Sequence, residues 1–221
     1  MLSMMLLLAT TAWAGGEKPM WGGIGHMTQG FMMGDVTGIG DALDNAADGG
    51  APGAAMLLGG GGRMLLGGLV VVGGGGHGRF GVPNEGVDYS IMTYGGGGQF
   101  DVGVLIYNQQ RSWVYPMVGV AFGGTDVVVA NHRNGPMSVG NVTMGSGDRL
   151  ELSGGYTAIE VGAGVTRLFF GPETQGGMVL DLQMAAWIPV STGEYSAGAV
   201  SGAPGGLLFR INAGGGGFAY K

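Results

Sequence analysis

The stretch Met178-Val179-Leu180-Asp181-Leu182-Gln183-Met184-Ala185-Ala186-Trp187-Ile188 alternates between two kinds of residue. Its even-numbered positions are all apolar, whereas its odd-numbered positions include Asp181 and Gln183. Side chains of a β-strand point to opposite faces in turn, so this spacing predicts a strand with one apolar and one polar face. The same alternation recurs in residues 159–166 and 99–106.

Turn-forming sequences divide the remaining chain into further segments of this kind. The expected strands are 19–33, 54–66, 69–80, 87–107, 113–130, 150–170, 178–190 and 207–220. About eight long strands joined as consecutive hairpins predict an all-β fold, an antiparallel up-and-down β-barrel that forms a single domain over residues 15–221. The alternation changes phase at Gly95–Gly98 and at Gly154–Gly155, which predicts a bulge or a turn that splits the strand.

One segment has helical spacing instead. Ile39, Leu43, Ala46 and Ala47 recur on one face, with Asp41, Asp44 and Asp48 opposite. Thr37 precedes the segment as a candidate N-cap, and Gly49-Gly50 ends it. We therefore expect one short helix over about residues 38–48.

The first fourteen residues predict an export signal. Residues 1–8 are almost entirely apolar, and Ala12-Trp13-Ala14 has the small-x-small pattern of a cleavage site. Residues 1–14 are thus expected to be a signal peptide. No later stretch has the roughly 20 consecutive apolar residues of a spanning helix, so a membrane location requires a closed barrel.

Composition excludes several classes of protein. The chain has 221 residues, of which 53 are glycine, none is cysteine and 11% are charged, with a net charge of −6. The absence of cysteine excludes a disulfide framework and thiolate chemistry. Only nine basic residues are present and they form no cluster, which argues against nucleic-acid binding. The mean hydropathy of +0.30 argues against a disordered chain.

Glycine runs are the most unusual local feature. Pairing across a turn at Gly67-Gly68 places two runs side by side, with Gly59 opposite Gly76, and a third run is expected next to them. Together they form a predicted glycine patch: Gly59, Gly60, Gly61, Gly62, Gly73, Gly74, Gly75, Gly76, Gly95, Gly96, Gly97 and Gly98. Three interpretations stay open: the patch is architectural, either allowing tight curvature or lying beneath the helix of residues 38–48; it is a seam where another copy docks; or it gives access to a ligand.

Charges inside otherwise apolar strands point to a polar lumen, because lipid-facing positions exclude them. The predicted lumen charge network consists of Asp101, Glu160, Arg167, Asp181 and Arg210. Either arginine can pair with Asp181, and the expected role is structural. Aromatic residues near strand ends predict an interfacial girdle made of Tyr107, Trp113, Tyr115 and Trp187.

Motifs that carry chemistry are weak or missing. Gly76-His77-Gly78-Arg79-Phe80-Gly81 matches the dinucleotide fingerprint, but it follows a strand without opening a helix. The zinc-protease, nucleophile-elbow and EF-hand patterns do not occur. We therefore expect no catalytic residue, no bound cofactor and no metal site.

The signal-like start, the succession of hairpins and the closing strand Leu207–Phe218 resemble small, glycine-rich bacterial outer-membrane β-barrel proteins. The resemblance departs at the last residues, Phe218-Ala219-Tyr220-Lys221, where such barrels end on an aromatic residue. It implies an outer-membrane location, the lipid bilayer as partner and a non-enzymatic structural, adhesive or small-solute role. The alternative is a secreted, extracellular glycine-rich β protein that self-assembles into a fibre, tube or surface layer, with the glycine patch joining copies into a homo-oligomer or polymer.

Overall fold

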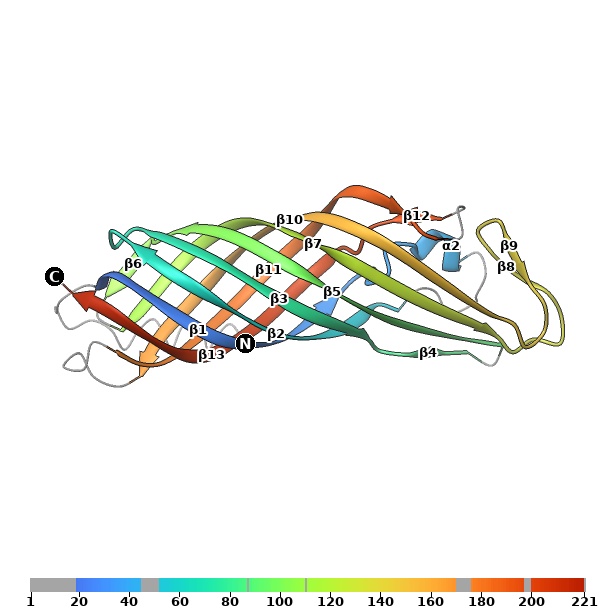
Figure 1. Ribbon diagram of the computed structural model, residues 1–221, viewed down its shortest axis with the longest axis horizontal. Coiled ribbons are helices and arrows are strands. Elements are labelled where there is room, and N and C mark those ends of the chain that lie inside the picture. The colour runs from blue at the N-terminus through green and yellow to red at the C-terminus, as the bar shows by residue number, and fades with distance from the viewer. Residues whose placement is uncertain are drawn as a thin grey trace.

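Eight long strands form one closed antiparallel barrel, which confirms the expected fold (Figure 1). The computed structural model describes residues 19–44, 52–86, 88–109, 111–169, 176–196 and 200–220. The barrel strands are β1 (Pro19–Met33), β2 (Ala54–Leu66), β3 (Val70–Gly81), β5 (Tyr89–Val104), β7 (Ser112–Asn131), β10 (Arg149–Phe169), β11 (Gly176–Glu194) and β13 (Gly206–Tyr220). The signal peptide predicted over residues 1–14 lies outside the described residues.

Closure comes from the pairing of the first barrel strand with the last. Each barrel strand pairs with its neighbours in chain order, and β1 pairs with β13 over most of its length. Every barrel strand therefore has a hydrogen-bonded neighbour on both sides, so the described barrel leaves no long strand edge open.

The offset between strands fixes the tilt of the barrel. Directly paired residues lead once around the wall: Gly177, Gly216, Ile24, Arg63, Gly73, Asp101, Gly119, Glu160 and Trp187. The circuit starts and ends on β11 but finishes ten residues farther along, at 187 instead of 177. An eight-stranded barrel with an offset of this size has strands tilted by roughly 40° and an interior just wide enough to be filled by side chains.

The two ends of the barrel differ in their connections. At one end the connections between strands are short: the turn 67–69, the segment that contains β6 (Tyr107–Gln109), and the link from β10 to β11. The opposite end, which we call the loop end, carries the longer connections (Figure 1). These contain α2 (Gly40–Asp44), β4 (Asn84–Glu85), the hairpin of β8 (Met137–Val139) and β9 (Val142–Met144), and β12 (Ser201–Gly202).

The predicted helix and strand breaks have different outcomes. Residues 40–44 are helical, residues 38 and 39 precede the helix, and the predicted part from residue 45 lies outside the described residues. The predicted split at the two glycine stretches is wrong, because β5 and β10 run through Gly95–Gly98 and Gly154–Gly155 without interruption. A register shift does occur close by, at Thr157 and Ala158 against β11.

Apolar side chains fill both ends of the interior. Toward the short-turn end, Trp113 and Phe218 meet edge to face with ring centroids 4.7 Å apart, beside Leu65, Val71 and Val179. At the loop end, a second cluster joins barrel residues to the connections: Ile39, Leu43, Tyr89, Ile91, Val127, Val129, Met137, Val139, Met144, Leu152, Tyr195 and Val200. The polar interior lies between this loop-end cluster and the apolar side chains around Trp113 and Phe218.

Candidate functional site: the polar network inside the barrel

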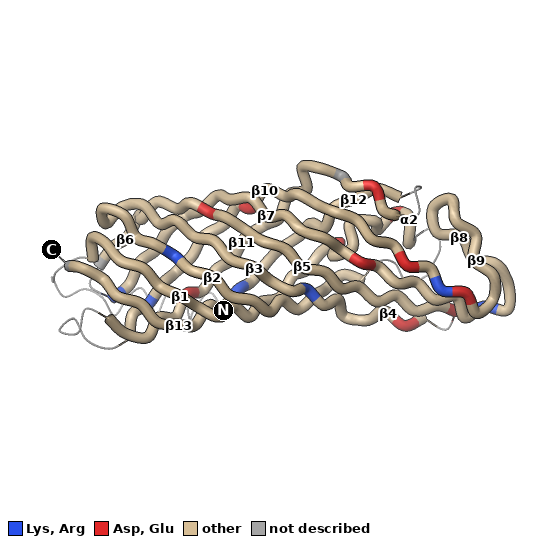
Figure 2. The backbone as a smooth tube through the Cα atoms, viewed as in Figure 1, with Lys and Arg blue, Asp and Glu red and all other residues tan. Residues whose placement is uncertain are grey.

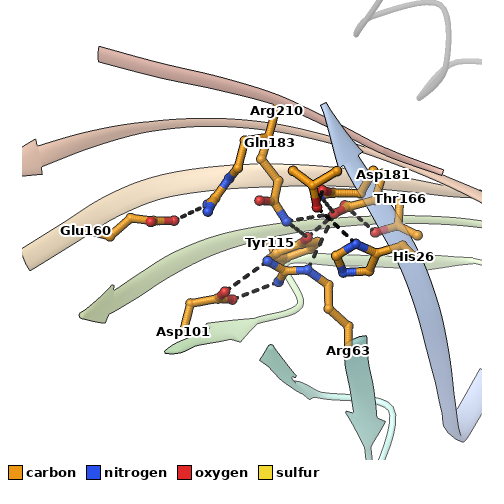
Figure 3. Close-up of polar contacts among 11 residues, drawn as sticks. His26, Arg63, Asp101, Tyr115, Glu160, Thr166, Asp181, Gln183 and Arg210 are labelled. Atoms are coloured by element: carbon orange, nitrogen blue, oxygen red, sulfur yellow. Dashed lines mark hydrogen bonds and ion pairs between the residues drawn. The ribbon is translucent and has the colours of Figure 1, made fainter. Parts of the chain in front are cut away.

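Asp181 is the centre of the polar interior (Figure 3). The alternation of β11 turns it inward, and its carboxylate is completely buried. It accepts hydrogen bonds from Tyr115 (2.7 Å), Thr166 (2.8 Å), Gln183 (2.6 Å) and Asn212 (2.8 Å). A buried carboxylate with four neutral donors is well solvated by the protein, so Asp181 ties four strands together.

Arg63 connects this centre to a second carboxylate. Its guanidinium holds Asp101 through two hydrogen bonds of 2.7 and 2.9 Å, and its Nε lies 3.4 Å from Asp181. Gly73 separates Arg63 from Asp101 in register, and a methyl group there would lie 2.9 Å from both side chains. Glycine at this position thus leaves the space in which the ion pair forms.

A separate ion pair lies farther toward the loop end. Arg210 donates through Nη2 to one oxygen of Glu160, and the indole of Trp187 donates to the other oxygen at 2.8 Å. All three side chains are at most 2% exposed. Figure 3 shows this pair beside the group formed by Arg63, Asp101 and Asp181.

The structure places four of the five predicted charges, namely Asp101, Glu160, Asp181 and Arg210, in the buried interior. Arg167 does not join them, because its odd-numbered position on β10 is on the outward register at the short-turn end, where its Nη1 donates to Ser112 at 2.9 Å. Sequence reasoning missed Arg63. Its signal was available: Arg63 shares the parity of the apolar residue Leu65, but the preceding glycine run hides the alternation.

The predicted aromatic girdle is wrong for three of its four members. Trp113, Tyr115 and Trp187 are 4%, 0% and 2% exposed and face the lumen, because they share the parity of inward residues on β7 and β11. Tyr107 is half-buried on β6 at the short-turn end. Aromatic side chains on the outward face are instead Trp21, Phe31, Phe80, Tyr94, Phe100 and Phe122.

Glycines form an oblique band across the barrel wall, here called the glycine band. Its cross-strand pairs are Gly177–Gly216, Gly215–Gly25, Gly25–Gly62, Gly62–Gly74, Gly76–Gly98, Gly97–Gly123 and Gly124–Gly155. The predicted three-strand patch is therefore one part of a band that crosses all eight strands. Its register was predicted one residue off: Gly59 faces His77, because the turn holds three residues, 67–69, not two.

The two faces of the band differ sterically. A methyl group added at the inward glycines Gly61, Gly97 or Gly123 would lie 2.3, 2.1 or 2.2 Å from a carbonyl oxygen of the neighbouring strand. At the outward glycines Gly76 and Gly124 the nearest atoms are 3.5 and 3.8 Å away. The backbone thus requires glycine on the inner face of the band, where strands approach closely, and leaves room for a side chain at outward positions such as Gly76 and Gly124.

The mouth of the barrel at the loop end is held by a buried tyrosine. The hydroxyl of Tyr195 donates to the carbonyl of Thr37, just before α2. Burial raises the pKa of Tyr195 to about 12, so this donor keeps its proton at neutral pH. The carboxylate of Asp35 accepts from the backbone N–H groups of Thr37, Gly38 and Gly40 at 2.9–3.0 Å and fixes the same segment.

Chemically, this arrangement is suited to holding strands together. Each interior carboxylate is occupied by arginine or by neutral donors. Among the residues that the structure describes, no group of three histidine or acidic side chains is placed to hold a metal ion. In the same part of the chain, no helix is long and apolar enough to cross a membrane.

Comparison with known proteins finds a likeness in architecture alone. No protein-family model matches the chain, and no curated protein matches it in sequence. Among solved structures, it is similar to the N-terminal β-barrel domain of Pseudomonas aeruginosa OprF, with 11% identity, a TM-score of 0.42, and coverage of 90% of this chain and 98% of that one. It is also similar to the attachment invasion locus protein Ail of Yersinia pestis (13%, TM-score 0.38, 93% and 99%) and to the outer membrane protease OmpT of Escherichia coli (8%, TM-score 0.40, 94% and 99%). At these values the likeness carries no information about activity or ligand.

Proposed function

We propose that this chain is a non-enzymatic outer-membrane β-barrel with a structural or adhesive role, which holds its loop end at the cell surface and does not conduct solutes. The observation that carries the proposal is the outer face of the barrel. Along the described barrel strands, outward charges occur only at Arg167 near the short-turn end and at Asp126, Arg149, Glu151 and Glu194 toward the loop end. The region between them carries no charge, and apart from Gln29 and Thr157 its outward residues are apolar or glycine, as suits a lipid-facing surface.

The size of the exposed side chains supports lipid as the surrounding medium. Met27, Met64, Phe100, Val118 and Ile188 are 52–78% exposed and lie on different strands. The contiguous apolar area of such a belt far exceeds the apolar patches that a monomeric soluble protein exposes to water. In the hydrocarbon of a bilayer, exposing these side chains has no hydrophobic cost. The hydrogen bonds between strands of the closed barrel pair the backbone N–H and C=O groups, which hydrocarbon cannot do.

The filled interior favours a structural role over solute passage. The ion pairs and the Asp181 centre occupy the middle of the lumen, with apolar clusters on both sides. Passage of a solute requires breaking bonds between buried charges, which is costly. The non-enzymatic assignment rests on the same geometry, because the interior carboxylates are already held by structural donors.

The loop end is the part that would meet a partner. In outer-membrane barrels the longer connections face outward and the short turns face the periplasm. Figure 2 shows acidic and basic residues close together near β8 and β9. An adhesive role assigns binding to these connections, which are the regions where specificity most often resides.

Self-assembly into a fibre needs open strand edges, and barrel closure argues against it. Barrel closure does not argue against contact between copies through the outward-facing glycines of the glycine band. Small residues allow close backbone approach in lipid, so a homo-oligomer through this surface stays an expectation.

The proposal is tested by fractionating cells that express the full chain and running the membrane fraction on a denaturing gel with and without boiling. We expect the protein in the outer membrane, with a mobility that changes on boiling as the barrel opens. Recovery as extracellular filaments, with no heat-modifiable membrane form, would contradict it.

Non-conduction has its own measurement. The refolded barrel in planar bilayers should give no steady conductance. Arg210→Ala, which removes one interior side chain, is the matched variant for comparison. A steady conductance of the unmodified chain would replace the structural role with solute passage while leaving the membrane location intact.

A further inference from the structure

Arg79 is the exception among the buried arginines. The described strands bury three arginines, Arg63, Arg79 and Arg210, each at most 5% exposed. Arg63 and Arg210 are paired with carboxylates. Arg79 is 1% exposed, and no carboxylate of the described residues lies within ion-pair distance of it. A buried charge without a counter-charge is costly, so this position requires an explanation.

The contacts of Arg79 satisfy only part of its guanidinium. Nη2 donates to Thr125, across Gly95, which lies between them in register. The guanidinium carbon lies 5.2 Å from the centre of the Tyr156 ring. A ring face attracts the charge but accepts none of the in-plane N–H bonds. Nε and Nη1 therefore remain without an acceptor in the described protein.

Two further polar atoms near Arg79 are also unpartnered. His77 precedes Arg79 by two residues on the inward face of β3, and its Nδ1 has no hydrogen-bond partner. Thr93, on the inward face of the adjacent strand β5, has an unpartnered hydroxyl. Of the ten buried polar side-chain atoms without a partner in the described protein, four belong to Arg79, His77 and Thr93. Such atoms are rare in folded proteins, so their concentration on one patch of two paired strands points to a ligand.

Nearby acidic groups of the protein do not supply a counter-charge for Arg79. Asp35 lies toward the loop end, but its two oxygens accept the N–H groups around Thr37. Glu160 is held by Arg210 and by the indole of Trp187. The neighbours of His77 in register are Gly59 and Gly97, which contribute no side chains.

We propose that Arg79, with the hydroxyl of Thr93 and the imidazole of His77, forms a binding site for a small inorganic anion in the half of the lumen next to the loop end. The anion is a halide or an oxyanion of phosphate size, because Arg79 is 1% exposed inside a closed barrel, a position that excludes a lipid headgroup. The inference is independent of the membrane location and of the role proposed for the barrel.

The test uses the full chain refolded in detergent micelles, with thermal unfolding followed by the gel shift between folded and unfolded bands. Ionic strength is held constant with sodium gluconate, whose anion is too large for the site, and gluconate is replaced stepwise by chloride or by phosphate. We expect a saturable rise in the unfolding midpoint with at least one of the two anions, of about 3–5 °C at ten times the dissociation constant.

Two variants separate a built site from general salt effects. Arg79→Met should abolish the rise but unfold in gluconate at or above the unmodified chain's temperature, because it removes an unpaired buried charge. Arg149→Met, which removes an exposed arginine, should keep the full rise. If Arg79→Met does not fold, Arg79→Lys keeps the charge and should show a weaker rise. No saturable rise with either anion, or an equal rise in Arg79→Met, overturns the proposal and leaves only adventitious ion binding.

Discussion

The inner and outer faces of the barrel wall follow opposite rules although they are made by alternate residues of the same strands. On the inner face, a methyl group at Gly123 would collide with a carbonyl oxygen 2.2 Å away, and every buried charge except Arg79 is held in a pair or a hydrogen-bonded group. On the outer face, Gly124 has its nearest atoms at 3.8 Å, and large apolar side chains are exposed. Backbone geometry and charge pairing thus determine which residues the inner face accepts, whereas the surrounding medium alone determines which residues the outer face accepts.

The largest expected effect is at adjacent glycines of β7. Gly123→Ala should prevent assembly of the barrel or destabilise it by more than about 3 kcal/mol, since a backbone carbonyl cannot move aside as a flexible side chain can. Gly124→Ala should fold normally and unfold within about 1 kcal/mol of the unmodified chain. The measurement is the folded fraction on an unboiled gel across a urea series. Equal behaviour of the two variants would remove the steric distinction between the faces.

Removal of an inner charge comes next. Arg63→Met leaves Asp101 without its counter-charge and weakens the support of Asp181, so it should cost about 3–5 kcal/mol in the free energy of unfolding. Adding Asp101→Leu to this variant should recover part of the loss. The exposed Arg149→Met serves as the control and should change stability by less than about 0.5 kcal/mol. A loss as small as that of the control would show that the pair is not structural.

A charge placed on the outer face should have a smaller cost that depends on depth. Val120→Lys, in the outward apolar part of β7, is expected to destabilise the barrel in lipid by about 2–4 kcal/mol. Glu194→Lys, exposed at the loop end of β11, should cost at most about 1 kcal/mol. Unfolding titrations in liposomes measure both. If Val120→Lys has no cost, lipid does not contact this face.

The smallest effect is spectroscopic. Trp21 is 56% exposed on the outer face, whereas Trp113 is 4% exposed in the lumen. Two variants that keep one of these tryptophans, with the other three of the chain's four replaced by phenylalanine, should differ in quenching by brominated lipids: strong for Trp21 and weak for Trp113. Strong quenching of Trp113 would restore the girdle position that the sequence first suggested for it.

Alternation in the sequence was sufficient to predict the strands, their faces and most of the interior charges. Asp181 and Glu160 stand out because their neighbours in the chain are apolar. Prediction failed in the glycine runs, because glycines have no side chains that show an alternation. The inward orientation of Arg63 and Arg79, which follow such runs, was therefore not recognised. The predicted register of β2 and β3 was off by one residue because the turn is one residue longer than expected. Turn length depends on backbone conformation, here with positive φ at both Gly67 and Gly68, and composition does not reveal that conformation.

The aromatic residues illustrate a different limit. Trp113, Tyr115 and Trp187 were assigned by their distance from strand ends, although their parity already placed them inside. Pairing across strands, such as the bond from Trp187 to Glu160, joins residues 27 positions apart and cannot be read from local spacing. The close approach of Gly97 to the carbonyl of Phe122 is likewise a property of the folded wall.

The most direct test of the two-faced wall is a single-cysteine scan through residues 178–188, because the chain has no cysteine of its own. In liposomes, a maleimide dissolved in the lipid should label cysteines at the outward positions Leu180, Leu182, Met184 and Ala186. Cysteines at the inward positions Val179 and Ala185 should react only after boiling. A period of two residues with this phase is the predicted result. Equal labelling at both sets, or protection of the outward set from lipid-dissolved reagent, would contradict the closed, lipid-embedded barrel.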